Sequence, residues 1–235
     1  MGYKTMDGNE AVSRVSYKFT ELAGIYPITP ASPMAEKIDI LSSTGEINFW
    51  GNKVKVIEMQ SEKGAVATIH GCLQSGILAT TYTASQGLLL MLPSIYKMAG
   101  ECLPAVIHVA ARSLSTHSLS IFGDHQDIYA VRQTGACMLS SSSVEEAYHM
   151  AMISHLSSIK SSLPFINFFD GFRTSHEIDK IKEIDLSKLE PLIDKKALKR
   201  FRENALVGTN TTRGTAENDD IYFQHTEARN IYYNK

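Results

Sequence analysis

Residues 54–110 read VKVIEMQSEKGAVATIHGCLQSGILATTYTASQGLLLMLPSIYKMAGECLPAVIHVA, and this stretch decides the fold. Three short apolar runs alternate with two longer segments of helical pattern. The runs are Val54–Met59, Ile77–Thr83 and Ala105–Ala110, and the helical segments span about 61–73 and 86–99. Parallel neighbouring strands need a crossover connection, which is usually a helix. The stretch therefore predicts an α/β fold, a parallel sheet with helices on both faces.

The same alternation continues on both sides of this stretch. Upstream, Asp7 and Glu10 have capping-box spacing, and apolar residues recur at helical intervals through Leu22 until Gly24. A strand over 24–28 and a helix beginning near Pro33 follow. Downstream we expect a strand over 136–139, a helix over 143–159 and a strand over 165–169.

The alternation stops after residue 169. We therefore divide the chain into an α/β domain over 1–190 and a C-terminal extension over 191–235. The extension carries a cluster of five basic residues, Lys195, Lys196, Lys199, Arg200 and Arg202, which we interpret as one solvated face of a helix.

Composition excludes several classes of protein. The 235 residues are 43% hydrophobic and 20% charged, which is typical of a folded globular chain. A net charge of -2 provides no large positive field, so a nucleic-acid partner is not expected. The longest apolar run, 87–96, is too short to cross a membrane, and the N-terminus lacks a signal-peptide pattern, so we expect a cytoplasmic protein. The three cysteines form no Cys-x-x-Cys motif for a metal or cluster.

Polar residues follow several of the predicted strands, where parallel α/β sheets bind their ligands. Thr29 lies between two prolines, Glu62 begins a helix, and Arg112 follows the 105–110 strand. Residues 118–127 form a long loop after Arg112. From the residues alone each position is ambiguous, because an acid in a first helical turn can be simply dipole-stabilised and a loop arginine simply solvated.

Five segments, however, resemble one known family closely. They are YPITP (26–30), EMQSE (58–62), TASQGLLLM (83–91), SIFGDHQD (120–127) and FFDGFRTSHE (168–177). In this order they resemble the N-terminal domain of pyruvate:ferredoxin (flavodoxin) oxidoreductase. The resemblance implies a domain similar to the pyrimidine-binding domain of thiamine-diphosphate enzymes. It also implies an activity, the oxidative decarboxylation of pyruvate with coenzyme A to acetyl-CoA, CO2 and reduced ferredoxin or flavodoxin.

The resemblance assigns roles to individual residues. Glu62 matches the glutamate that hydrogen-bonds the aminopyrimidine ring of the cofactor and favours the tautomer that can take a proton. Thr29 and Arg112 match the residues that hold pyruvate, and a guanidinium with a fixed hydroxyl suits a carboxylate. Pro27 and Ile121 match residues of the cofactor-binding wall.

The resemblance also implies what lies elsewhere in the enzyme. Thiamine diphosphate is shared with another domain, and Mg2+ and the iron–sulfur clusters belong to domains outside this chain, which itself holds no metal. We therefore expect a fragment of a larger polypeptide that is a homodimer when complete and that is inactive by itself.

Other functions remain as alternatives. Ser85 lies between a strand and a helix, as a hydrolase nucleophile does, with Asp170 and His176 later in the expected order. The glycine expected two residues before that serine is replaced by Thr83, which argues against a serine hydrolase. The loop residues His117, Asp124, His125 and Asp127 match no familiar metal-ligand spacing. A third alternative is a non-catalytic assembly module.

Overall fold

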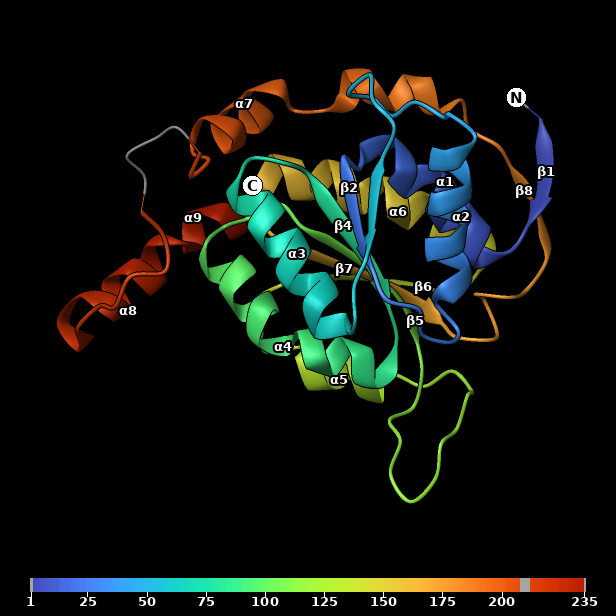
Figure 1. Cartoon of the computed structure of the whole chain (residues 1–235), viewed down its shortest axis with the longest axis horizontal. Coiled ribbons are helices and arrows are strands. Elements are labelled where there is room, and N and C mark those ends of the chain that lie inside the picture. Colours follow the sequence, from blue (N-terminus) through green and yellow to red (C-terminus); the bar gives the residue numbers. More distant parts are fainter. Residues whose placement is uncertain (1, 208–211, 235) are drawn as a thin grey trace.

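The computed structural model describes residues 2–207 and 212–234. Within these residues the main sheet has six strands, all parallel, in the order β3-β2-β4-β5-β7-β6 (Figure 1). The parallel α/β fold predicted from the sequence is confirmed. In chain order the strands are β2 (Leu22–Ile25), β3 (Lys55–Glu58), β4 (Ala79–Thr83), β5 (Val106–Ala111), β6 (Cys137–Ser141) and β7 (Phe165–Asp170).

Helices cover both faces of this sheet, as predicted (Figure 1). One layer consists of α1 (Gly8–Phe19), α2 (Ser32–Ser43) and α6 (Val144–Ser161). The other consists of α3 (Glu62–Gln74), α4 (Ser85–Gly100) and α5 (Gln126–Val131). Every residue of β4 and β5 is buried, because a central strand between two helical layers has no face toward solvent.

The helix starts predicted at Asp7 and Ser143 have their capping hydrogen bonds. The side chain of Asp7 accepts a bond from the backbone N–H of Glu10 at 2.7 Å. At the start of α6, Ser143 accepts from the N–H of Glu146, whose carboxylate in turn accepts from the N–H of Ser142 at 2.8 Å. These side chains satisfy N–H groups that a helix leaves without internal partners.

The predicted end of the first helix is wrong. The N–H of Thr20 closes α1 by bonding to the carbonyl of Ser16 at 3.1 Å, and the backbone of Thr20 is already extended. Leu22 therefore begins β2, and the strand predicted at 24–28 lies two to three residues earlier than expected. Gly24 is a packing residue inside this strand, because a Cβ there would lie 2.8 Å from the carbonyl oxygen of Ala65 on α3.

Several elements were not predicted. β1 (Tyr3–Met6) pairs antiparallel with β8 (Asp179–Lys182), so the N-terminus is tied to the chain that follows the main sheet. The short helix α5 begins at Gln126, at the end of the loop expected over 118–127, and continues to Val131, where no element was predicted. These elements depend on partners far away in sequence, which local patterns do not report.

The C-terminal region contains η1 (Leu186–Leu192), α7 (Lys195–Glu203), α8 (Asp219–Ala228) and α9 (Asn230–Tyr233). The basic side chains of α7 are exposed, as predicted, while Leu198 and Phe201 pack into the main core. No residue of α8 or α9 is buried. The boundary between 190 and 191 stays a prediction, and residues 208–211 and 235 of the predicted extension lie outside the described residues.

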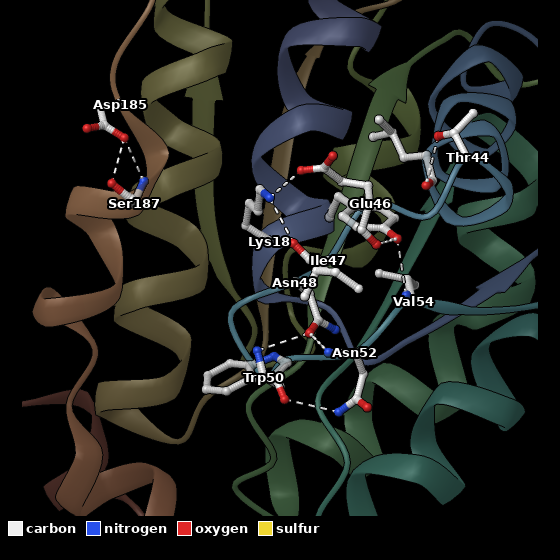
Figure 2. Close-up of polar contacts among 12 residues, drawn as sticks. Lys18, Thr44, Glu46, Ile47, Asn48, Trp50, Asn52, Val54, Asp185 and Ser187 are labelled. Atoms are coloured by element: carbon white, nitrogen blue, oxygen red, sulfur yellow. Dashed lines mark hydrogen bonds and ion pairs between the residues drawn. The ribbon is translucent and has the colours of Figure 1, made fainter.

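The loop between α2 and β3 is held at the end of α1 by polar contacts (Figure 2). The side-chain oxygen of Asn48 accepts bonds from the N–H groups of Trp50 and Asn52, both at 3.0 Å. The indole N–H of Trp50 donates to the carbonyl of Phe19 at 2.9 Å. Lys18 bonds to Glu46 in the same loop. These contacts fix the start of β3, the strand that leads to Glu62.

The structure also bears on membrane spans, metal-binding groups and disulfides. No helix among them is long and apolar enough to cross a membrane. Within residues 2–207 and 212–234, no group of three or more His, Cys, Asp or Glu side chains could hold a metal ion. Cys72, Cys102 and Cys137 form no disulfide and are half-buried, and burial raises the pKa of the Cys72 and Cys137 thiols.

Candidate active site

The predicted site residues lie after neighbouring strands of the sheet. The strands β3, β2, β4 and β5 are adjacent in this order. The segments that follow them, loops or first helical turns, carry Glu62, Thr29, Gln86 and Arg112 respectively. Since parallel strands end at the same edge, the fold brings these four side chains to one edge of the sheet.

Glu62 is the first residue of α3, where the side chain of Ser61 caps the helix by accepting from the N–H of Gly64 at 3.3 Å. Only 8% of Glu62 is exposed. Among the described residues, no protein group donates a hydrogen bond to its carboxylate. A carboxylate oxygen accepts hydrogen bonds, so this position is suited to a ligand that donates one.

A glycine lies directly against this carboxylate. A Cβ at Gly87, in the first turn of α4, would lie 2.7 Å from Cγ and 2.9 Å from Oε1 of Glu62. It would also lie 2.5 Å from Oγ1 of Thr83, a buried hydroxyl with no hydrogen-bond partner among the described residues. A side chain at position 87 would therefore displace the Thr83 hydroxyl or the Glu62 carboxylate, so the glycine leaves both groups in place.

Arg112 follows β5 and is 6% exposed. Its Nη1 donates to the carbonyl oxygen of Thr29 at 2.7 Å, and its Nη2 donates to Oε1 of Gln86 at 3.3 Å. Burial lowers the pKa of the guanidinium, while the charges of Asp127 and Glu62 act in the opposite direction. Nε is buried and has no partner within the described residues. The guanidinium is thus held from two strand ends and retains unused donors.

Thr29 contacts Arg112 through its backbone rather than its hydroxyl. The residue is exposed, and the peptide bond between Thr29 and Pro30 is cis. Pro27 is also exposed. Ile121 is 43% exposed, in a loop that returns to Ser113 through a bond from the Ser113 N–H to the carbonyl of Phe122 at 3.4 Å. The roles predicted for Thr29, Pro27 and Ile121 stay predictions.

Two residues of this edge were not predicted as site residues. Gln86 accepts the bond from Arg112 described above. Asp127 is fully buried, and its Oδ2 accepts bonds from the N–H groups of Ser85 at 2.7 Å and Arg112 at 3.1 Å. No local pattern singles out either residue, because their partners come from other strand ends.

The hydrolase alternative is wrong for this fold. Ser85 is fully buried, and its hydroxyl lies 2.6 Å from Oε1 of Gln86 and 2.6 Å from the carbonyl of Ser113. The expected partners are engaged elsewhere, since Asp170 bonds to His125 at 2.8 Å and His176 bonds to its neighbour Ser175 at 2.7 Å. A serine nucleophile needs a base in hydrogen-bond reach, and no histidine bonds to Ser85 in the described chain.

Comparison with known proteins gives one family. Residues 14–235 match the family described as pyruvate flavodoxin/ferredoxin oxidoreductase, thiamine diphosphate-binding. The chain is 60% identical over 231 residues to a pyruvate-flavodoxin oxidoreductase of Enterobacter agglomerans and covers 20% of that protein. It is 55% identical over 234 residues to the pyruvate:ferredoxin oxidoreductase of Moorella thermoacetica, again covering 20% of it. These matches cover 98% and 99% of the chain. The chain thus spans about a fifth of these two relatives.

The fold also resembles a solved structure. A 2-oxoglutarate:ferredoxin oxidoreductase from Magnetococcus marinus matches with a TM-score of 0.69 and 20% sequence identity. The match covers 80% of this chain and 32% of that one. At this identity the likeness concerns the arrangement of strands and helices alone.

Proposed function

Because the chain belongs to the thiamine diphosphate-binding family of pyruvate flavodoxin/ferredoxin oxidoreductases, we propose that it forms the pyrimidine-binding part of a pyruvate oxidoreductase. That enzyme oxidatively decarboxylates pyruvate with coenzyme A and passes electrons to ferredoxin or flavodoxin. The observation that carries the proposal is the buried carboxylate of Glu62, which lies against Gly87 without a protein hydrogen-bond donor in the described residues.

The residues present fit the aminopyrimidine ring of thiamine diphosphate. Glu62 offers a carboxylate with no protein donor in the described chain, and Gly87 leaves room for this carboxylate because it has no side chain. A flat heteroaromatic ring with polar edge atoms needs such a hydrogen-bond acceptor. When bound, the cofactor supplies an acidic thiazolium carbon whose conjugate base can attack a keto carbon.

Each side chain of this chain then has a defined task. Glu62 would hold a proton at the ring nitrogen, through a carboxylate on a residue that is only 8% exposed. Arg112 binds the carboxylate of pyruvate through guanidinium N–H groups that Thr29 and Gln86 do not use. The exposed side chain of Thr29 adds a hydroxyl beside this arginine.

The remaining parts of the reaction are assigned to protein outside this chain. We propose that other domains bind the diphosphate, Mg2+ and the iron–sulfur clusters, that the complete enzyme is a homodimer, and that it works in the cytoplasm. The chain spans about a fifth of the Enterobacter and Moorella relatives, which supports the assignment of these groups to other domains.

The proposal is tested by comparing the isolated chain with the assembled enzyme that contains it. We expect the assembled enzyme to reduce flavodoxin or ferredoxin when pyruvate and coenzyme A are added, and not when 2-oxoglutarate replaces pyruvate. The isolated chain should show no such activity and no tight, Mg2+-dependent binding of thiamine diphosphate by calorimetry. Tight binding to the isolated chain would contradict the proposed sharing of the cofactor. An assembled enzyme that binds the cofactor normally after Glu62 and Arg112 are replaced would favour the assembly-module alternative.

A further inference from the structure

Asp127 connects two strand ends of the candidate active site. It lies in the first turn of α5 and is fully buried. Its Oδ2 accepts from the N–H groups of Ser85 and Arg112, at 2.7 Å and 3.1 Å, and its Oδ1 accepts from the N–H of Ile128 at 2.8 Å. Ser85 follows the end of β4 and Arg112 follows the end of β5. One carboxylate thus binds the backbones of two neighbouring strands.

The bonds of this carboxylate reach beyond α5. Within the helix it bonds only to the N–H of Ile128, whereas its other two donors, Ser85 and Arg112, come from outside α5. Burial raises the pKa of Asp127, and the three backbone N–H groups oppose that effect. The charge of Asp127 also favours the charged form of Arg112, against the burial of the guanidinium.

A chain of hydrogen bonds through Ser85 and Gln86 also connects Asp127 to the guanidinium of Arg112. Ser85 has a φ of +48°, a conformation that residues with a side chain rarely adopt, and its N–H bond to Asp127 helps to hold it there. In this conformation the Ser85 hydroxyl lies 2.6 Å from Oε1 of Gln86. The same oxygen accepts from Nη2 of Arg112. Asp127 therefore fixes the backbone of Arg112 directly and its guanidinium through Ser85 and Gln86.

We propose that Asp127 is a positioning residue for Arg112. It sets the direction of the guanidinium toward the substrate carboxylate without touching the substrate. The inference rests on the proposed function, in which Arg112 binds pyruvate.

The first test is Asp127→Asn in the assembled enzyme. An amide offers one oxygen where the carboxylate offers two, so its NH2 group faces either the N–H groups of Ser85 and Arg112 or the N–H of Ile128, and the negative charge beside Arg112 is lost in both cases. We expect the KM for pyruvate to rise by roughly tenfold, the range for a lost buried hydrogen bond, with a smaller change in kcat and in the KM for coenzyme A. Calorimetric binding of oxamate, an unreactive analogue of pyruvate, should weaken by a similar factor. An unchanged KM and unchanged oxamate binding would overturn the proposal.

Asp124→Asn is the matched control. Asp124 lies three residues earlier and bonds to the N–H of Gln126 at 2.9 Å, outside the contacts to Arg112. Its replacement should leave pyruvate kinetics near those of the wild type. A rise equal to that of Asp127→Asn would mean that the loop, and not the buried carboxylate, controls binding.

The second test separates positioning from general stability. In an Arg112→Ala background, Asp127→Asn should cause no further loss of kcat/KM for pyruvate, because the residue through which it acts is absent. An equal loss in both backgrounds would show a merely structural role and overturn the proposal. If Arg112→Ala alone leaves pyruvate and oxamate binding unchanged, the proposed function of Arg112 fails, which is a different result.

Gln86→Leu tests the same link if Asp127→Asn does not fold, as judged by thermal melting. It removes the acceptor for Nη2 of Arg112 but leaves the backbone bonds of Asp127 in place. We expect a severalfold rise in the KM for pyruvate that disappears in the Arg112→Ala background. No rise, or the same rise in both backgrounds, would overturn the route through Gln86 and with it the proposal.

Discussion

Two buried polar clusters of this protein differ in charge and in their hydrogen-bond partners. Between β5 and α6, Nε2 of His108 and Nε2 of His155 share a hydrogen bond at 3.1 Å. At the carboxyl edge of the same sheet, Glu62, Thr83 and Arg112 are also buried, yet the first two have no protein hydrogen-bond partner in the described chain. We call these the core histidine network and the strand-end site.

The core histidine network is built from side chains of α1, α6 and three strands. Nδ2 of Asn167 donates to Nδ1 of His108 at 3.1 Å, so Nε2 of the neutral His108 ring carries the proton and donates to His155. Oδ1 of Asn167 is a buried atom of this group without a hydrogen-bond partner in the described chain. The ring of Tyr82 stacks on His108, and that of Phe19 stacks on His155. Burial lowers the pKa of His155 to about 3 and that of His108 well below its usual value, so both rings are neutral.

The difference indicates what each cluster does. Neutral rings that pair with each other lose little by burial and stabilise the fold. The guanidinium of Arg112 has unused donors and the carboxylate of Glu62 has no protein donor in the described chain, so a ligand can complete their hydrogen bonds. We therefore expect changes in the strand-end site to affect reaction and binding, and changes in the core histidine network to affect stability alone.

The largest effect is expected for Arg112→Ala. If its guanidinium pairs with the substrate carboxylate, the loss should be about 2 to 5 kcal/mol of binding, seen as a much higher KM for pyruvate in the assembled enzyme. The KM for coenzyme A should change far less. Steady-state kinetics with each substrate varied in turn measures both, and an unchanged KM for pyruvate would make Arg112 a structural residue.

Glu62→Gln should slow proton exchange at the thiazolium carbon of bound cofactor by roughly a hundredfold or more, because an amide cannot hold the proton. A glutamate that only interacts with the helix dipole would contribute about 0.3 to 1 kcal/mol to stability and nothing to turnover. Hydrogen–deuterium exchange in the assembled enzyme distinguishes the two, with thermal melting as the control. Wild-type exchange in a folded, cofactor-saturated variant would remove Glu62 from the mechanism.

Acid should destabilise the fold through the core histidine network. The pKa of His155 is about 3 in the folded chain and near 6.5 when unfolded, so between these values the unfolded state binds more protons. The free energy of unfolding should therefore fall as the pH falls from 7 to 5, by at most about 1.4 kcal/mol per pH unit for this one group. Urea unfolding at several pH values measures the slope. His155→Gln should flatten it, whereas His149→Gln, on the same helix outside the network, is the control.

The smallest effect is expected for Tyr82→Phe. The Tyr82 hydroxyl lies 2.8 Å from Oγ of Ser16, which also donates to the carbonyl of Ser13. Removing it should cost about 1 kcal/mol of stability, since Ser16 keeps a partner. The urea midpoint should shift while the KM for pyruvate stays constant. A changed KM would show that the two clusters are coupled through β4.

Much of the fold follows from local sequence. Alternating strands and helices are visible because each strand is apolar and each helix repeats its apolar residues at helical spacing. The caps at Asp7 and Ser143 form within a single turn, so their spacing predicts them. Thr29, Glu62 and Arg112 could be singled out because each follows a predicted strand, although the resemblance to a family was needed to assign their roles.

The tertiary structure decided the rest, and the physical reason is that these features depend on partners distant in sequence. The strand order places the loop after β2 between those after β3 and β4, which no local pattern determines. The helical spacing of apolar residues places Leu22 in α1. In the structure Leu22 belongs to β2 instead, because it pairs with residues of β3 and β4. In the sequence Asp127 cannot be distinguished from an ordinary loop acid, because the two N–H groups that bond to its carboxylate, those of Ser85 and Arg112, follow other strands. The sequence by itself thus determined the elements and the candidate residues, whereas only tertiary packing decided which of them share a site.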